Sequence, residues 1–326
     1  MSLSRRFILA AASALACAAL SPAASAQNYP GHAVSVVVPF AAGGSTDLLA
    51  RVVARALEKF GGQPFVVDNA GGAGSTLGTA KVAAAAPDGY TLLLGSSSAL
   101  VMAPHLYPAL KYDPFKSFEP IARIASAPYV LVTRADSKFQ SYGDLAAFGA
   151  KNPDKLNYGS PGEGSALHLT IELMLDGGKF RATHIPYRGS APAWAALLAG
   201  DVDFIIDTPS GALPMITSGK ARALAVTSAR RLPELPDVRT LDELGQKGFE
   251  SEAWFALLAP KATPAPVVAT LRKLADQVLR DPEVRSALQA NHFTPTSPDS
   301  GDLAQDIRRE YEKWGAIIKA RGIQLK

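Results

Sequence analysis

The chain has 326 residues, and its 33 Lys and Arg side chains outnumber its 29 Asp and Glu side chains by only enough for a net charge of +4. The excess is spread out, and its densest pairs, Arg230-Arg231 and Arg308-Arg309, have no aromatic residues between them, which argues against a nucleic-acid partner. A chain of this length exceeds one comfortable hydrophobic core, so two lobes are expected.

The first 26 residues are typical of a secretory signal peptide. Arg5 and Arg6 supply a positive start, the apolar run after them is too short to cross a bilayer, and residues 24–26 are small, as a cleavage site requires. We therefore predict cleavage after Ala26 and a periplasmic location. Export follows the Sec route or, because residues 4–9 partly match its signal, the twin-arginine route. A buried N-terminal helix is the alternative.

Cys17 is the only cysteine, and it lies inside this segment. Ala14 stands where a lipoprotein signal has a leucine-like residue, so lipidation is a weak alternative. After cleavage the chain has no thiol, which excludes a disulfide, a cysteine nucleophile and a thiolate metal site. Loss of the two signal arginines also reduces the net charge from +4 to about +2.

Short apolar runs alternate with amphipathic stretches through most of the chain. The first helix of this series has leucines and valines at helical spacing and stops at Gly61-Gly62. The alternation indicates an α/β fold with mixed, mostly parallel sheets flanked by helices. Strands are predicted at residues 34–40, 65–67, 91–94, 129–133, 155–158, 204–206, 224–227 and 254–259, and helices at 47–60, 165–175 and 191–198.

The C-terminal third has a different pattern. Helices are predicted at residues 264–280, 282–290 and 301–320, separated by proline and glycine, with no strand between them. These helices suit packing onto a lobe that is already formed. No repeat of fixed period is visible after the signal.

Two loops share one plan: a strand, a glycine-rich turn and the start of a helix. A helix N-terminus presents unpaired N–H groups and a partial positive charge, so it holds anions, and Ser or Thr hydroxyls add neutral donors. Two such loops facing across a cleft suit a carboxylate, especially a dicarboxylate; simple N-caps and tight turns are the alternative. The candidate ligand contacts are Phe40, Ala41, Gly43, Gly44, Ser45, Thr46 and Asp47 in the first loop and Tyr158, Gly159, Ser160, Gly164, Ser165 and Ala166 in the second.

A third glycine-rich stretch covers residues 68–78. Its spacing from Gly72 is G-x-G-x-x-x-G rather than the dinucleotide pattern, and the acidic residue which that pattern needs is missing. No cofactor is therefore expected. A loop that contacts a small ligand mainly through its backbone is the simpler interpretation of this stretch. Asn69 and Gly72, with Ser96 and Ser98 after the next strand, are further candidate contacts.

No catalytic arrangement is found, since the chain has neither a G-x-S-x-G elbow nor a P-loop. His168 lies one helical turn after Ser165 and could touch the cleft, although a structural role is the simpler alternative. Asp207 ends an apolar strand where α/β sheets place ligand groups, so it could bind an ammonium group or a water, or cap the next turn. Asp47 caps its helix or orients the ligand. No metal is expected, because no metal-ligand spacing relates the five histidines, His32, His105, His168, His184 and His292.

At these loops the sequence resembles the substrate-binding proteins of tripartite tricarboxylate transporters, also called the Bug family. The resemblance covers nearly the whole chain after the signal, and so many matches in one order are specific for the family. The matching runs are Pro39-Phe40-Ala41-Ala42-Gly43-Gly44-Ser45-Thr46-Asp47, Asp68-Asn69 with Gly72-Ala73-Gly74, Pro87-Asp88-Gly89-Tyr90-Thr91-Leu92, Tyr158-Gly159-Ser160 with Gly162, Gly164-Ser165 and His168-Leu169, Ile185-Pro186-Tyr187-Arg188-Gly189, Arg222-Ala223-Leu224-Ala225-Val226-Thr227 and Leu235-Pro236-Asp237-Val238.

The resemblance implies a two-lobed periplasmic-binding-protein fold, type II-like, with the ligand cleft between the lobes. Lobe 1 would comprise residues 27–125 and 251–326, and lobe 2 residues 126–250. The two loops would hold a di- or tricarboxylate, an acidic amino acid or an aromatic acid, often through bridging waters. The protein would act as a monomer and deliver this ligand to the membrane permease subunits of such a transporter.

The sequence departs from the family's pattern at three places. Ala70-Gly71 replaces the usual Arg-Pro, Ala42 stands where proline is frequent, and Met102-Ala103-Pro104 replaces a usual Asn-Pro. The first and last changes could alter the pocket wall, so the identity of the ligand is not transferred.

Two other functions stay open. A ligand sensor would close in the same way but dock on a membrane signalling partner, and the genes beside this one would separate the two. A periplasmic hydrolase would use Ser45, Ser160 or Ser165 with His168, although neither an elbow nor a triad order supports it.

Overall fold

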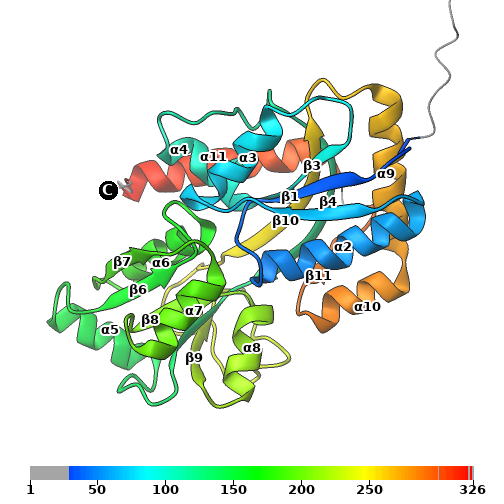
Figure 1. Cartoon of the computed structure of the whole chain (residues 1–326). Helices are drawn as coiled ribbons and strands as arrows, with labels where there is room; N and C mark the ends of the chain where they lie inside the picture. The colour runs from blue at the N-terminus through cyan, green and yellow to red at the C-terminus, as the bar shows by residue number, and fades with distance from the viewer. Residues whose placement is uncertain (1–28, 300, 322–323, 325–326) are drawn as a thin grey trace, which may run out of the picture.

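The computed structural model describes residues 29–299, 301–321 and 324, and its strands form two separate sheets, each flanked by helices (Figure 1). The signal peptide predicted for residues 1–26 lies outside the described residues. The first sheet contains β1 (Val34–Val38), β2 (Phe65–Asn69), β3 (Thr91–Ser96), β4 (Phe118–Pro128), β10 (Glu252–Pro260) and β11 (Thr294–Pro295). The second contains β5 (Val130–Arg134), β6 (Asn157–Ser160), β7 (Thr183–Pro186), β8 (Phe204–Asp207) and β9 (Ala221–Val226).

The helices follow the strands in alternation and then dominate the C-terminal part. None of those in the described ranges combines the length and apolarity of a membrane span. They are α2 (Ser45–Gly61), α3 (Thr76–Ala83), α4 (Ala103–Leu106), α5 (Tyr142–Lys151), α6 (Ala166–Gly177), α7 (Ser190–Ala199), α8 (Pro209–Thr217), α9 (Ala265–Arg280), α10 (Pro282–Ala290) and α11 (Leu303–Arg321), with a 3₁₀ turn, η1 (Ala73–Ser75), and a π-helical turn, η2 (Ser98–Met102).

The two sheets repeat one strand order, β2-β1-β3-β10-β4 with β11 at the edge in the first and β7-β6-β8-β5-β9 in the second. β1 and β6 hold equivalent places and run parallel to both of their neighbours. The strands next to the junction, β4, β5 and β10, pair antiparallel with their neighbours. The sheets are therefore mixed, as predicted, but the expectation that they are mostly parallel is wrong: among the described residues four strand pairs are parallel and five are antiparallel, because the crossing strands run against the rest.

The chain crosses between the sheets twice. Tyr129 alone separates β4 from β5, and residues 227–251 lead from β9 to β10. Thr227 ties the crossings together: its hydroxyl accepts from Tyr129 N–H at 2.8 Å and donates to the Ser251 carbonyl at 2.6 Å. We use lobe 1 for the first sheet with its helices and lobe 2 for the second. The two-lobed fold is confirmed, whereas the division at residues 126 and 250 stays a prediction.

Each sheet packs helices on both faces. In lobe 1, α2, α9 and α10 pack together on one face, and α3 and α11 lie on the other (Figure 1). In lobe 2, successive residues of β5 point to opposite faces, as a strand requires. Val130 and Val132 join the apolar cluster of Trp194 from α7, whereas Leu131 joins the larger cluster that contains Leu145 from α5.

All eight predicted strands and all six predicted helices have counterparts in the structure. The sequence missed β4, β7, α3, α4, α5 and α8, whose apolar residues are too few or too interrupted to show a period. The prediction of no strand among the C-terminal helices is wrong. β11 lies between α10 and α11, and its two residues, which pair with β4, are too short for any pattern to reveal.

Two adjacent leucines in α2 test the placement of this helix. Leu49 is fully buried, whereas Leu48 is 39% exposed. Leu49→Ala should lower the free energy of unfolding by about 2–5 kcal/mol, because it removes buried methyl groups and leaves a cavity. Leu48→Ala is the matched control and should cost less than about 1 kcal/mol. Urea denaturation measures both, and equal losses would contradict this orientation of α2.

Candidate functional site

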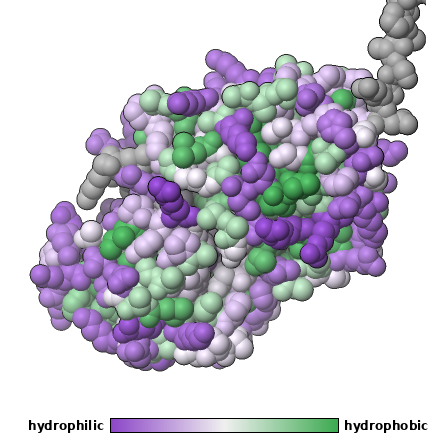
Figure 2. Space-filling model, viewed as in Figure 1, coloured by the Kyte–Doolittle hydropathy of each residue, from purple (hydrophilic) through white to green (hydrophobic). Residues whose placement is uncertain are grey.

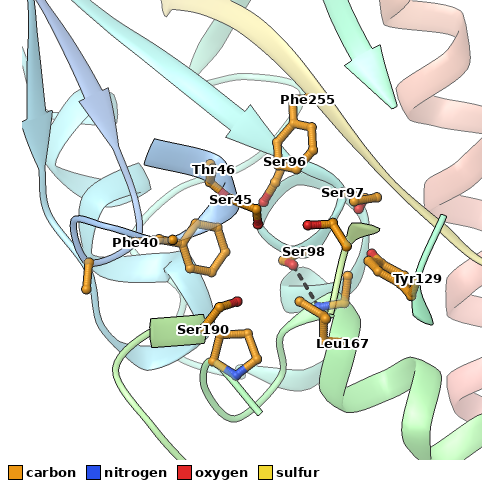
Figure 3. Close-up of a pocket in the computed structure, with 16 residues that line it drawn as sticks. Phe40, Ser45, Thr46, Ser96, Ser97, Ser98, Tyr129, Leu167, Ser190 and Phe255 are labelled. Atoms are coloured by element: carbon orange, nitrogen blue, oxygen red, sulfur yellow. Dashed lines mark hydrogen bonds between the residues drawn. The ribbon is translucent and has the colours of Figure 1, made fainter. Parts of the chain in front are cut away.

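A cavity lies between the two sheets, with walls from both lobes (Figure 3). Its empty space, mouth included, is about 450 Å³. The walls of the cavity stand close together. It is lined by Phe40, Ala41, Gly44, Ser45, Thr46, Ser96, Ser97, Ser98, Tyr129, Pro161, Ala166, Leu167, Ser190, Thr208, Ala253 and Phe255.

The structure brings together part of the predicted set. Phe40, Ala41, Gly44, Ser45, Thr46, Ser96, Ser98 and Ala166 line the cavity. The other candidates are not among its lining residues: Gly43, Asp47, Asn69 and Gly72 in lobe 1, and Tyr158, Gly159, Ser160, Gly164, Ser165, His168 and Asp207 in lobe 2. Both predicted loops therefore reach one cavity, although only some of their residues face it.

Four helices begin at this cavity. Ser45, Ala166 and Ser190 are the first residues of α2, α6 and α7, and Thr208 is the N-cap of α8. The N-caps of α2, α7 and α8 make no side-chain capping hydrogen bond. The dipoles of these helices favour an anion at their starts, although the Asp207 carboxylate already accepts hydrogen bonds at the starts of α7 and α8. No Lys, Arg or His is among the described residues that line it.

The first loop is held from behind by Asp47 and Asn69. The Asp47 carboxylate accepts from Gly43 N–H and from Arg51 Nε, both at 3.0 Å, and Asn69 donates to the Phe40 carbonyl at 3.2 Å. Burial raises the pKa of Asp47, but hydrogen bonds from Arg51, Gly43 and Asn69 outweigh it and leave the pKa below its usual range. Asp47 is thus a charge paired with Arg51, and it shapes the turn at Gly43, where φ is +84°.

The second loop is held by a neutral histidine. His168 Nδ1 accepts from Gly164 N–H at 3.0 Å, and Ser165 Oγ caps α6 by accepting from His168 N–H. Burial, with a smaller contribution from the stacked ring of His184, lowers the pKa of His168 to about 3. The ring therefore stays uncharged near neutral pH and remains an acceptor for Gly164.

The residues of the hydrolase alternative are not brought into a nucleophile–base arrangement. The His168 ring bonds Gly164 rather than a serine hydroxyl. Ser160 Oγ lies 2.6 Å from Nε2 of His184 instead, and neither residue lines the cavity. Ser45 lines the cavity, but no histidine does among the described residues.

Asp207 acts on the cavity through two other residues. It is 1% exposed, and its carboxylate accepts from Trp194 Nε1 at 2.7 Å, Thr208 N–H at 2.8 Å and Ser190 Oγ at 3.2 Å. Burial raises the pKa of Asp207 to about 6, although these hydrogen bonds oppose the shift. Asp207 therefore orients Ser190 and Thr208, which line the cavity.

Half of the cavity wall was not predicted. Ser190 and Thr208 could have been found, because each follows a strand and begins or caps a helix, as the two recognised loops do. Pro161 and Leu167 flank the second loop. Tyr129 is a crossing residue, Ala253 and Phe255 lie in β10 just after the second crossing, and Ser97 lies between β3 and η2. No local motif marks these four residues.

The lobes touch beside the cavity. Tyr107, just after α4, donates its hydroxyl to the Glu163 carbonyl of lobe 2 at 2.6 Å, and Ala166 N–H donates to Ser98 Oγ at 2.7 Å (Figure 3). A Cβ at Gly74 would clash with the Glu163 carbonyl, so the two backbones come this close only with glycine there. Figure 2 shows the lobes in contact along a junction of pale, weakly polar residues, with hydrophilic residues on the outer ends.

Two α/β lobes that enclose a cavity between them define the class of periplasmic solute-binding proteins, and solved structures agree. A periplasmic binding protein, BugD, is 38% identical with a TM-score of 0.86 over 91% of this chain and 100% of that one. A protein of R. palustris solved with adipate is 33% identical, with a TM-score of 0.87 over 91% and 100% of the two chains. MatC from Rhodopseudomonas palustris, with bound malate, is 35% identical, with a TM-score of 0.85 over 89% and 100%.

The family is also established. The family model of the tripartite tricarboxylate transporter family receptor matches residues 49–323. The chain belongs to this family of solute-binding proteins, as its ordered loop motifs predict.

The hydrogen bond between Tyr107 and Glu163 is expected to stabilise the closed arrangement of the lobes. Tyr107→Phe removes a hydrogen bond that joins the lobes, so ligand affinity should fall about 3- to 10-fold if the bond forms only on closure. Tyr112→Phe is the matched control, because the Tyr112 hydroxyl bonds Ala99 inside lobe 1; it should lower stability and leave affinity unchanged. Calorimetric titration with an acid that binds the wild type measures both. Equal affinities for the two variants would contradict a role in closure.

The buried carboxyl of Asp207 predicts a pH dependence of stability. Because its pKa is about 6 in the folded protein and 3.8 for an aspartate in water, the folded state holds the proton more tightly, and stability falls as pH rises from about 4 to 6. Asp207→Asn cannot titrate. The wild type should therefore lose about 3 kcal/mol relative to this variant across that interval and nothing more above it. Urea denaturation at several pH values measures the difference, and a constant difference would contradict the burial of this carboxyl.

Proposed function

We propose that this protein is exported to the periplasm, captures one small carboxylate between its lobes and delivers it unchanged to the permease subunits of a tripartite tricarboxylate-type transporter. One observation carries the proposal: four helix N-termini meet at a cavity that has no basic side chain among its described lining residues. Backbone N–H groups and hydroxyls then supply all of the attraction for a guest, and such groups favour anions.

The contacts that we propose come from both lobes. Gly44, Ser45 and Thr46 face the ligand from lobe 1, and the start of α7 at Ser190 faces it from lobe 2. The contact at α7 is to backbone N–H groups, because the Ser190 hydroxyl donates to Asp207. Because the ligand touches both, it favours the closed form over the open one, which is the signal that a membrane partner can recognise.

Two relatives support an organic acid as the ligand. One was solved with adipate and another with malate, and both ligands carry two carboxylates. Neither identity is transferred, because this chain departs from the family beside the cavity. A Cβ at Gly71 would lie 2.9 Å from Ala41 N, so the change from Arg-Pro to Ala70-Gly71 affects the backbone of a loop that lines it.

A panel of mono-, di- and tricarboxylates tests the proposal by thermal unfolding of the wild type. A rise in melting temperature with at least one acid is expected, because a ligand that binds only the folded state stabilises it. No response to any acid, with the protein shown to be folded, would contradict carboxylate capture.

Ser45→Asp separates binding from stability. The new carboxylate stands at the first position of α2, where the helix dipole favours it, but Ser45 is only 7% exposed, so burial of the charge opposes this gain. Urea denaturation of the ligand-free variant measures the balance separately from binding. The new carboxylate also repels an anionic guest, so the response to acids should disappear. Ser45→Asn is the neutral control and should keep most of the response. A full response from Ser45→Asp would contradict anion binding at this helix.

A further inference from the structure

Three hydroxyl groups on one wall of the cavity have no hydrogen-bond partner in the described part of the chain. They belong to Ser96, Ser97 and Tyr129, which line the cavity and are 3%, 0% and 0% exposed. A buried hydroxyl without a partner costs about 1–3 kcal/mol, so such groups are normally satisfied. Figure 3 shows Ser97 and Tyr129 across the cavity from Phe40 and Ser190. A polar group of the guest is the natural partner for this wall.

Negative side chains act on this wall as well. The charges that act on Tyr129 are negative: burial first, and then Glu252, Asp207 and Glu310, raise the pKa of Tyr129 well above its usual range. Ser97 is near enough to oppose this shift, but the two hydroxyls do not meet hydrogen-bond geometry. Tyr129 is therefore a neutral hydroxyl that can donate or accept, in a negative field.

The nearest helix start offers this wall little positive potential. Two first-turn N–H groups of α6 are already bonded, Ala166 N–H to Ser98 and His168 N–H to Ser165. A second carboxylate at this wall would lose its water and meet the charges of Glu252 and Asp207, with no Lys or Arg among the described lining residues, which is costly. An uncharged oxygen would satisfy the same hydroxyls without that cost.

We infer that Ser96, Ser97 and Tyr129 form a second polar subsite, which receives an uncharged oxygen at the end of the ligand remote from its carboxylate. The substrate class is then a monocarboxylate that carries a hydroxyl or carbonyl group. Phe40, Leu167 and Phe255 supply apolar surface for the carbon skeleton between the two ends. This inference rests on the proposed function, since it assumes that the helix N-termini hold the carboxylate.

Matched acids test the subsite by calorimetric titration of the wild type. The probes are the unbranched alkanoates of four to seven carbons, the ω-hydroxy acids and α,ω-diacids of the same lengths, and benzoate with its para-hydroxy and para-carboxy derivatives. At the chain length that fits best, the hydroxy acid should bind at least about 3- to 10-fold more tightly than the plain acid, because it gains one or more hydrogen bonds. It should also bind more tightly than the diacid of the same length.

Two variants test whether the hydroxyls of Tyr129 and Ser97 cause the preference for the hydroxy acid. Tyr129→Phe and Ser97→Ala should each lower the affinity for the hydroxy acid about 3- to 10-fold and leave the affinity for the plain acid unchanged. Neither should destabilise the ligand-free protein, because each removes a hydroxyl that has no partner there. Tyr112→Phe, which alters a tyrosine outside the cavity, should affect neither acid.

The outcomes separate the inference from the proposed function. Tighter binding of the diacid, or equal losses for plain and hydroxy acids in both variants, would overturn the neutral subsite while carboxylate capture stands. If no acid of any series binds the folded wild type, the proposed function fails and the subsite fails with it.

Discussion

The meeting of four helix N-termini at one cavity is the constraint on which the rest of the site depends. It follows from the topology, because β1, β6, β7 and β8 are each followed by one of these helices and run parallel to a neighbour in their sheets. The carboxyl ends of parallel strands lie at one edge of a sheet, and ligands bind there in open α/β folds. The two edges face each other, so the anion site that we propose draws on helix starts from both lobes.

Residues behind the cavity fix the direction of its hydrogen bonds. Ser190 donates to Asp207, so it offers only lone pairs to a guest, whereas Ser98 accepts from Ala166 N–H and keeps its own proton free. Asp47 is paired with Arg51, and His168 is neutral, so the supports of the two loops add little net charge near the guest. This explains how predicted residues can shape the site without touching it.

The sequence alone predicts the fold, the family and two loops that reach one cavity, because glycines, serines and helical spacing are local signals. Asp207 was correctly placed at a strand end, but whether it caps or binds depends on Trp194 and Ser190, which only the folded chain brings to it. Tyr129 and Phe255 could not be predicted. They come from segments more than 100 residues apart that meet only because the chain crosses twice between the lobes.

The central claim is that the cavity recognises negative charge through backbone N–H groups. The most direct test compares, by calorimetric titration, the tightest-binding acid with its primary amide, which has nearly the same shape but no charge. The account predicts that the amide binds at least about 10- to 100-fold more weakly, since charged acceptors make the stronger hydrogen bonds. Equal affinity of acid and amide would contradict it.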